Sequence, residues 1–346
     1  MGKTKLILMC GGKSSEHKIS RLSATSVLKN INKDKYRLTL VGIDLDGGFY
    51  ELDPTVDLNS KQWLDGARKI TDIFELLKAN DVVWPMLHGL FGEDGTIQGL
   101  FELADISYVG CKVLASAVAM DKIYTKKVLD SANVPQTPSL YVKKLKNGQL
   151  VVVDDEFDFH PNIEEIIEDK LSFPCFVKAS RQGSSVGCYK VNKKSELMEK
   201  LEQASYYDDK VVVEKAINCV ELEVGVMGND EVVVSPVGQV MPHGEFYTFE
   251  SKYEDSESST VIPARVDKKI QEDIRALALR AYRAIDGSGY SRVDFFLDQD
   301  TGAVYLNEIN TLPGFTNISM FPMLMAAAGY DYPTLIDELI GYGMEK

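Results

Sequence analysis

Apolar and polar residues along the first 120 positions follow the pattern of a protein in which strands and helices alternate. Three short apolar runs predict buried strands, and two stretches with apolar residues at helical spacing predict helices. The strands are expected at 5–10, 37–43 and 81–87, and the helices at 20–31 and around 70–78. Because such alternation favours a parallel sheet, the sequence predicts an N-terminal α/β domain over residues 1–121.

The rest of the chain mixes strands, helices and long polar loops. After a helix at about 120–132, strands are expected at 173–178, 188–191, 210–214 and 221–228, and helices at 195–205 and 269–285. The segment 243–263 has no clear period, and loops of this length inside compact domains are often lids. The acid-rich segment 154–170 suggests no chemistry. We expect an α+β arrangement with a central subdomain over 122–216 and a C-terminal subdomain over 217–346.

The most informative stretch is a predicted hairpin within residues 291–316. Arg292 and Asp294 are two residues apart, as are Glu308 and Asn310, so the strand period places each pair on one face of its strand. A short turn between the strands would bring the four side chains together. Magnesium prefers oxygen ligands and is usually shared with substrate phosphates, so the two acids and the amide predict a Mg-nucleotide site. The alternative is a half-solvated hairpin with ordinary surface acids.

A glycine- and serine-rich loop at 180–187 follows the predicted strand that ends in Lys178. Its N–H and hydroxyl groups could cover phosphates, with Lys178 and Lys122 as further phosphate contacts, although a plain hairpin would have the same pattern. The link after the strand at 210–214 could present backbone groups to an adenine. Glu221 could reach a ribose, but Glu221 and Glu223 share a strand face, so one of them could be only a surface acid.

Two polar residues follow the first and third predicted strands. The loop 11–17 lacks the G-x-G-x-x-G pattern of a dinucleotide site, and its Glu16 would repel a pyrophosphate but suits a substrate ammonium. Alternatively, Glu16 is a first-turn residue favoured by the helix dipole. His88 lies at a strand's carboxyl end, where open α/β sheets bind ligands, and it could bind a carboxylate or merely satisfy a loop carbonyl.

Composition narrows the class of protein. The formal charge of -14 argues against a nucleic-acid or anionic-membrane partner. Five scattered cysteines without C-x-x-C spacing predict neither a disulfide framework nor a zinc site. The apolar run at 6–10 is too short for a signal peptide or a membrane span, so we expect an unprocessed cytoplasmic protein.

Seven motifs occur in a fixed order along the chain: GGKSSEHKIS at 11–20, HGLFGEDGTIQG at 88–99, MDK at 120–122, SRQGSSVG at 180–187, SKY at 251–253, RVD at 292–294 and NEINTLPGFT at 307–316. With these motifs the sequence resembles the D-alanine:D-alanine ligases of the ATP-grasp superfamily over nearly its whole length. The resemblance implies that ATP phosphorylates one D-alanine and that the amine of a second D-alanine attacks the acyl phosphate, which supplies a peptidoglycan precursor. It also implies a homodimer.

The resemblance assigns a role to particular residues. Those implied in catalysis are Glu16, Ser184, Tyr253, Arg292 and Gly314. Those implied in binding the amino-acid substrates are Glu16, His88, Lys252, Ser319 and Met320. Nucleotide contacts would come from Lys122, Lys178, Ser184, Ser185, Glu214, Lys215, Ala216, Ile217 and Glu221. Two Mg²⁺ ions, for which Mn²⁺ could substitute, would be bound by Asp294, Glu308 and Asn310.

The motifs leave the second substrate open, because relatives that join D-alanine to D-serine or D-lactate share most of them. The apolar Met320 stands where a D-serine enzyme tends to carry arginine, and Lys252-Tyr253 resembles the dipeptide ligases, so D-alanine is favoured. Two other classes stay open. One is an inactive nucleotide-binding regulator, and the other is a dinucleotide oxidoreductase, which the missing glycine pattern disfavours.

Overall fold

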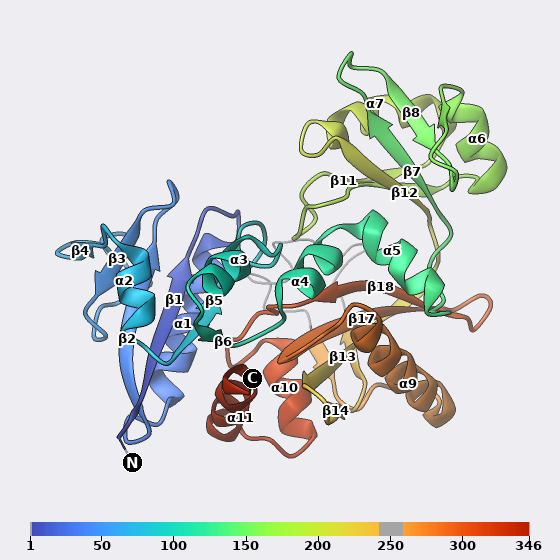
Figure 1. Ribbon diagram of the computed structural model, residues 1–346. Coiled ribbons are helices and arrows are strands. Elements are labelled where there is room, and N and C mark those ends of the chain that lie inside the picture. The colour runs from blue at the N-terminus through green and yellow to red at the C-terminus, as the bar shows by residue number, and fades with distance from the viewer. Residues whose placement is uncertain (1, 242–258, 346) are drawn as a thin grey trace.

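A computed structural model describes residues 2–241 and 259–345 of the chain, which form three sheets with helices packed against them (Figure 1). The first sheet lies at the left of Figure 1, the second at the upper right and the third below the second. Most of the predicted lid, with Lys252 and Tyr253, lies outside the described residues.

The first sheet has the strand order β4-β3-β2-β1-β5-β6. Its four parallel strands are β1 (Thr4–Gly11), β2 (Tyr36–Ile43), β5 (Val82–Met86) and β6 (Ser107–Tyr108). The short strands β3 (Phe49–Leu52) and β4 (Arg68–Lys69) extend one edge in the antiparallel sense, which the sequence pattern did not predict. The parallel centre of the N-terminal sheet is therefore confirmed.

Strand β1 is apolar from Leu6 to Cys10 because both faces of the first sheet are covered there. Leu6 and Leu8 belong to one hydrophobic cluster, which includes residues of α1 (His17–Asn30), α10 (Met320–Ala327) and α11 (Tyr332–Met344). The alternate residues of β1 belong to a second cluster, with α2 (Ile73–Lys78) and α3 (Thr96–Leu103). The C-terminal helices thus complete the core of the N-terminal sheet.

The second sheet is antiparallel and has the order β11-β10-β12-β7-β8-β9. Its strands are β7 (Ser139–Lys144), β8 (Leu150–Val153), β9 (Phe159–His160), β10 (Cys175–Ala179), β11 (Cys188–Val191) and β12 (Lys210–Lys215). One face is covered by α6 (Ile163–Lys170) and α7 (Lys194–Ser205). The acid-rich segment thus contains an amphipathic helix, whose Ile163 and Ile167 are buried.

The third sheet is also antiparallel, in the order β16-β15-β13-β17-β18, with β14 paired to β13. Its strands are β13 (Cys219–Gly228), β14 (Val232–Val234), β15 (Gly238–Met241), β16 (Ser259–Val261), β17 (Tyr290–Asp298) and β18 (Val304–Asn310). Helices α4 (Val113–Met120), α5 (Lys122–Ser131) and α9 (Lys268–Ala284) share its hydrophobic cluster. The division of the chain at 121 and 216 stays a prediction. None of the described helices is long and apolar enough to cross a bilayer.

Candidate active site

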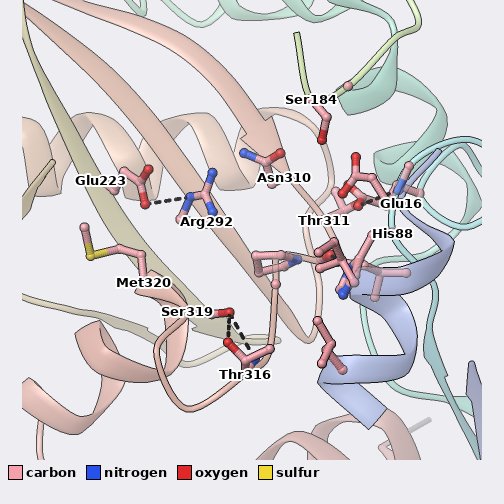
Figure 2. Close-up of a pocket in the computed structure, with 18 of the residues that line it drawn as sticks. Glu16, His88, Ser184, Glu223, Arg292, Asn310, Thr311, Thr316, Ser319 and Met320 are labelled. Atoms are coloured by element: carbon pink, nitrogen blue, oxygen red, sulfur yellow. Dashed lines mark hydrogen bonds and ion pairs between the residues drawn. The ribbon is translucent and has the colours of Figure 1, made fainter. Parts of the chain in front are cut away.

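A cavity of about 440 Å³ opens where the loops of the first sheet, the loop between β10 and β11, and the β17–β18 hairpin meet (Figure 2). Figure 2 shows Glu16 and His88 on one side of this cavity, with Ser184 above them, and Arg292 and Met320 on the other. The predicted site residues that line it are Glu16, His88, Lys122, Ser184, Arg292, Glu308, Asn310, Gly314, Ser319 and Met320.

The predicted hairpin places its polar residues side by side. Strand β17 pairs with β18 so that Arg292 lies opposite Asn310 and Asp294 lies opposite Glu308. Arg292 donates through Nε and Nη2 to the two Asp294 oxygens, both at 2.7 Å, and Asn310 Nδ2 donates to Asp294 Oδ2 at 3.0 Å. Burial would lower the pKa of Arg292, but Asp294 and Glu223 raise it well above its usual value, so the guanidinium is charged.

Glu223 is a site residue that the sequence left undecided. It lies on β13 directly across from Asp294, and its Oε2 lies 2.9 Å from Arg292 Nε. Its side chain is 7% exposed and lines the cavity, so it is not a surface acid. The feature of the sequence that pointed to this position is that Glu221 and Glu223 lie on the same face of their strand. Which of the two meets Arg292 depends on how β13 pairs with β17.

The oxygen donors of the hairpin fit a hard cation. Because Asn310 uses its amide nitrogen on Asp294, its carbonyl oxygen is the atom that it can offer to an ion. In the part of the chain that the structure describes, no group of three or more His, Cys, Asp or Glu side chains is placed to hold a metal. Two carboxylates and one amide suit Mg²⁺, which completes its shell with water and phosphate oxygens.

Lys178 belongs to a buried ion cluster between the second and third sheets. Its Nζ lies 2.5 Å from Glu214 Oε2 and 5.9 Å from the ring centre of Phe296 on β17. Glu214 Oε1 lies 2.8 Å from the ammonium of Lys126, a residue of α5 that the sequence did not point to. Burial would raise the pKa of Glu214, but the two ammonium groups lower it well below its usual value.

The loop between β10 and β11 folds over the cavity. Lys122 Nζ donates to the Gln182 carbonyl at 2.7 Å and lies 4.0 Å from Glu308. At Gly183, an added Cβ would lie 3.0 Å from Glu16 Oε1, so this loop closely approaches the loop after β1. Ser184 lines the cavity with a positive φ of 50°. That this loop is a flap over bound phosphates stays a prediction.

Glu16 and His88 enter the cavity from the first sheet in different ways. Glu16 caps α1 through its backbone, and its side chain makes no capping hydrogen bond, which leaves the carboxylate in the cavity. His88 Nδ1 donates to the Leu312 carbonyl at 2.7 Å, and its Nε2 lies 2.9 Å from Ser23 Oγ. Burial lowers the pKa of His88, so the ring is neutral and accepts from Ser23. His88 thus satisfies a loop carbonyl through Nδ1, and its role near a substrate carboxylate stays a prediction.

Ser23 extends this link to the loop after β18. The Phe315 N–H donates to Ser23 Oγ at 3.1 Å, so His88 and Ser23 together hold both ends of the segment from Leu312 to Phe315. Gly314 lies within this segment and lines the cavity. The histidine therefore positions the backbone that was predicted to bind an oxyanion.

Glu93 is another carboxylate in the cavity that the sequence did not single out. Its Oε1 accepts from the Gly89 N–H at 3.0 Å. Burial and the nearby Glu16 carboxylate raise the pKa of Glu93 well above its usual value. The feature of the sequence that could have pointed to Glu93 is its position in the glycine-rich loop that begins at His88.

The far end of the cavity combines a hydroxyl pair with an apolar wall. Ser319 Oγ accepts from the Thr316 N–H at 3.0 Å and lies 2.8 Å from Thr316 Oγ1. Met320 is buried in a small cluster with Val240 and Leu324 and also faces the cavity.

Two family models match the chain, the D-ala D-ala ligase N-terminus over residues 5–111 and the D-ala D-ala ligase C-terminus over residues 146–341. The chain belongs to the D-Ala D-Ala ligase family. A D-alanine–D-alanine ligase of Acetivibrio thermocellus is 45% identical over 99% of this chain and 96% of its own length. Another, of Clostridium acetobutylicum, is 45% identical over 98% of this chain and 97% of its own length.

Solved structures of the D-Ala D-Ala ligase family agree with the fold. The D-alanine-D-alanine ligase of Coxiella burnetii has a TM-score of 0.86 and 32% identity, over 99% of this chain and 94% of that one. The VanG D-Ala:D-Ser ligase of Enterococcus faecalis has a TM-score of 0.85 and 33% identity, over 99% of this chain and 100% of that one. The expected family, of ATP-grasp type, and the expected α/β fold class are therefore confirmed.

The structure leaves some predicted family residues away from the cavity lining. Asp294 lies beside it through its contacts with Arg292 and Asn310. The backbone N–H groups of Lys215 and Ala216 donate to the carbonyls of Pro138 and Pro174, respectively. The predicted residues that do not line this cavity are Lys178, Ser185, Glu214, Lys215, Ala216, Ile217, Glu221 and Asp294.

Proposed function

We propose that the protein uses ATP to join two D-alanine molecules into D-alanyl-D-alanine through an acyl phosphate. One observation carries this proposal: a single cavity has a carboxylate, Glu16, on one side and a buried cation, Arg292, on the other. The carboxylate suits the ammonium of the first D-alanine. The guanidinium suits the negative charge that develops when its activated carboxyl group is attacked.

In the first step, the carboxylate of the first D-alanine attacks the γ-phosphoryl group of ATP and ADP leaves. Lys122 and Lys178 bind phosphates, and the flap with Ser184 and Ser185 covers them. Asp294, Glu308 and Asn310 hold two Mg²⁺ ions, or Mn²⁺ in their place, which supply positive charge at the phosphates. The segment from Glu214 through Lys215 and Ala216 to Ile217 binds the adenine, and Glu221 binds the ribose.

In the second step, the amine of the second D-alanine attacks the acyl carbon, a proton is lost and inorganic phosphate leaves. Arg292 and the Gly314 N–H stabilise the tetrahedral oxyanion, and donors of this kind contribute about 3 to 4 kcal/mol each. His88 holds the loop that contains Gly314 and lies near the carboxylate of the first D-alanine. Ser319 binds the second carboxylate, and Lys252 and Tyr253 of the lid close over the substrates and exclude water.

D-Alanine is the proposed second substrate because Met320 presents an apolar wall that suits a methyl group. D-Serine and D-lactate are the alternatives within the family, since one relative of similar fold is described as a D-Ala:D-Ser ligase. The setting would be the cytoplasm, where ATP is available, with a role in peptidoglycan precursor synthesis. A homodimer stays a prediction that analytical ultracentrifugation would test.

The test measures phosphate release from Mg-ATP with D-alanine alone, and then with an equal concentration of D-serine or D-lactate added. The products of each reaction are separated and identified. The proposal expects turnover on D-alanine alone and Ala-Ala as the main product of each mixture. A mixed product dominated by D-serine or D-lactate would keep the mechanism but refute the argument from Met320. ATP binding without amino-acid-dependent ADP release would instead favour a regulator.

A further inference from the structure

Arg292 has carboxylate partners on two different strands. Asp294, on the same strand, accepts from Nε and Nη2 at 2.7 Å, and Glu223, on β13, lies 2.9 Å from Nε. Figure 2 shows the Glu223 carboxylate directed at Arg292 from the side away from Glu16. All three side chains are nearly buried, so these contacts are made in a region of weak solvent screening.

The hydrogen bonds of Asp294 leave little room for another cation. Its Oδ2 accepts from Arg292 Nη2 and from Asn310 Nδ2, which uses both lone pairs of that oxygen. Its Oδ1 accepts from Arg292 Nε. A metal ion that draws on both oxygens must therefore weaken the hold of Asp294 on Arg292. The two cations compete for the same carboxylate.

A buried guanidinium that loses its partner is strongly disfavoured, because removing one member of a buried pair leaves an uncompensated charge. Glu223 lies on a separate strand and is outside the metal set, so it can keep Arg292 paired during this exchange. We propose that Glu223 is a positioning residue: it holds Arg292 in the cavity when Asp294 turns to a divalent cation, and it thereby strengthens metal binding. This inference rests on the metal site of the proposed function.

The experiment measures Mn²⁺ binding, with Mn²⁺ replacing Mg²⁺, through the electron paramagnetic resonance signal of the free ion. Full-length wild type and variants are titrated with and without ADP, so no turnover is needed. Glu223→Gln keeps the size of the side chain and removes its charge, and it should weaken Mn²⁺ binding about tenfold, the scale of one charged hydrogen bond. Glu231→Gln, the same change at an exposed position beyond the other end of β13, is the matched control and should bind as the wild type does.

Two further variants separate an effect through Arg292 from a loss of negative charge near the metal. Glu223→Asp keeps the charge but is too short to reach Nε, so it should also bind Mn²⁺ more weakly than the wild type. In an Arg292→Met background, Glu223→Gln should have no further effect, because the residue through which Glu223 acts is gone. Thermal unfolding without metal checks that each variant folds, and Glu223→Asp carries the test should Glu223→Gln not fold.

The outcomes distinguish this inference from the function on which it rests. Equal Mn²⁺ affinity in wild type and Glu223→Gln would overturn the role of Glu223 and leave the metal site intact. Wild-type affinity in Glu223→Asp, or the same weakening by Glu223→Gln in both backgrounds, would show a through-space charge effect and also overturn it. A wild type that retains no Mn²⁺ with or without ADP would refute the proposed metal site and this inference together.

Discussion

Replacing Glu214 by Gln should destabilise the protein more than any ordinary surface change. Its carboxylate lies 2.8 Å from the Lys126 ammonium and 2.5 Å from that of Lys178, and the three side chains are 6%, 11% and 16% exposed, respectively. Glu214→Gln leaves two buried ammonium groups against a neutral amide. Removing one partner of a buried pair typically costs 3 to 5 kcal/mol, so we expect the free energy of unfolding to fall by about 3 kcal/mol.

A second variant tests whether charge balance sets this cost. Lys126→Met leaves the Glu214–Lys178 pair neutral overall and should lower the free energy of unfolding by only about 1 kcal/mol. Glu202→Gln, on the exposed face of α7 over the same sheet, is the control and should change it by less than about 0.5 kcal/mol. Urea unfolding at pH 7, followed by circular dichroism, measures the free energy of unfolding of Glu214→Gln, Lys126→Met and Glu202→Gln relative to the wild type.

The pH dependence gives an independent check. Because the pKa of Glu214 is lower in the folded protein than its ordinary value of 4.5, the unfolded chain takes up the proton first as the pH falls. Stability from this group is therefore fully present above pH 4.5 and is lost progressively below it. The difference in the free energy of unfolding between the wild type and Glu214→Gln should therefore become smaller as the pH falls below 4.5. Equal stabilities at pH 7, or a gap that does not change on acidification, would refute the reasoning.

Three further substitutions test the proposed catalytic machinery. Glu308→Gln removes a metal charge and should abolish turnover while leaving the unfolding midpoint nearly unchanged; an active variant would contradict the metal assignment. Gly314→Ala places a Cβ 3.0 Å from Ser319 Oγ, so kcat should fall by about tenfold or more and KM for the second D-alanine should rise; unchanged steady-state constants would argue against the oxyanion role. Gly183→Ala places a Cβ 3.0 Å from Glu16 Oε1 and should raise ATP hydrolysis relative to dipeptide, measured as the ratio of phosphate to product; an unchanged ratio would count against flap closure.

The sequence could predict the hairpin because its chemistry is local. The two-residue spacing places Arg292 and Asp294 on one face of their strand and Glu308 and Asn310 on one face of theirs. The register shifts between Asp294 and Phe295, and this irregularity brings the two pairs onto the same face, which spacing and turn length alone did not predict. The same locality identified the first sheet, where buried strands are continuous apolar runs. The edge strand β4 has only two residues, Arg68 and Lys69, and carries no such run.

Residues whose roles depend on distant pairing could not be found this way. Glu223 meets Arg292 only because β13 pairs with β17, about 70 positions later in the chain. Lys126 meets Glu214 because a helix packs near β12, and nothing in the spacing of these two residues indicates it. The helix α6 was readable in principle, since Ile163 and Ile167 are four residues apart, but the surrounding acids concealed it.

The most direct test of the account follows an oxygen atom through the reaction. D-Alanine labelled with ¹⁸O in its carboxyl group is incubated with the protein and Mg-ATP, and the released phosphate is analysed by mass spectrometry. An acyl phosphate formed in this cavity transfers one carboxyl oxygen to phosphate, so we predict phosphate with one ¹⁸O atom for each dipeptide formed. Dipeptide accompanied by unlabelled phosphate would contradict the proposed mechanism.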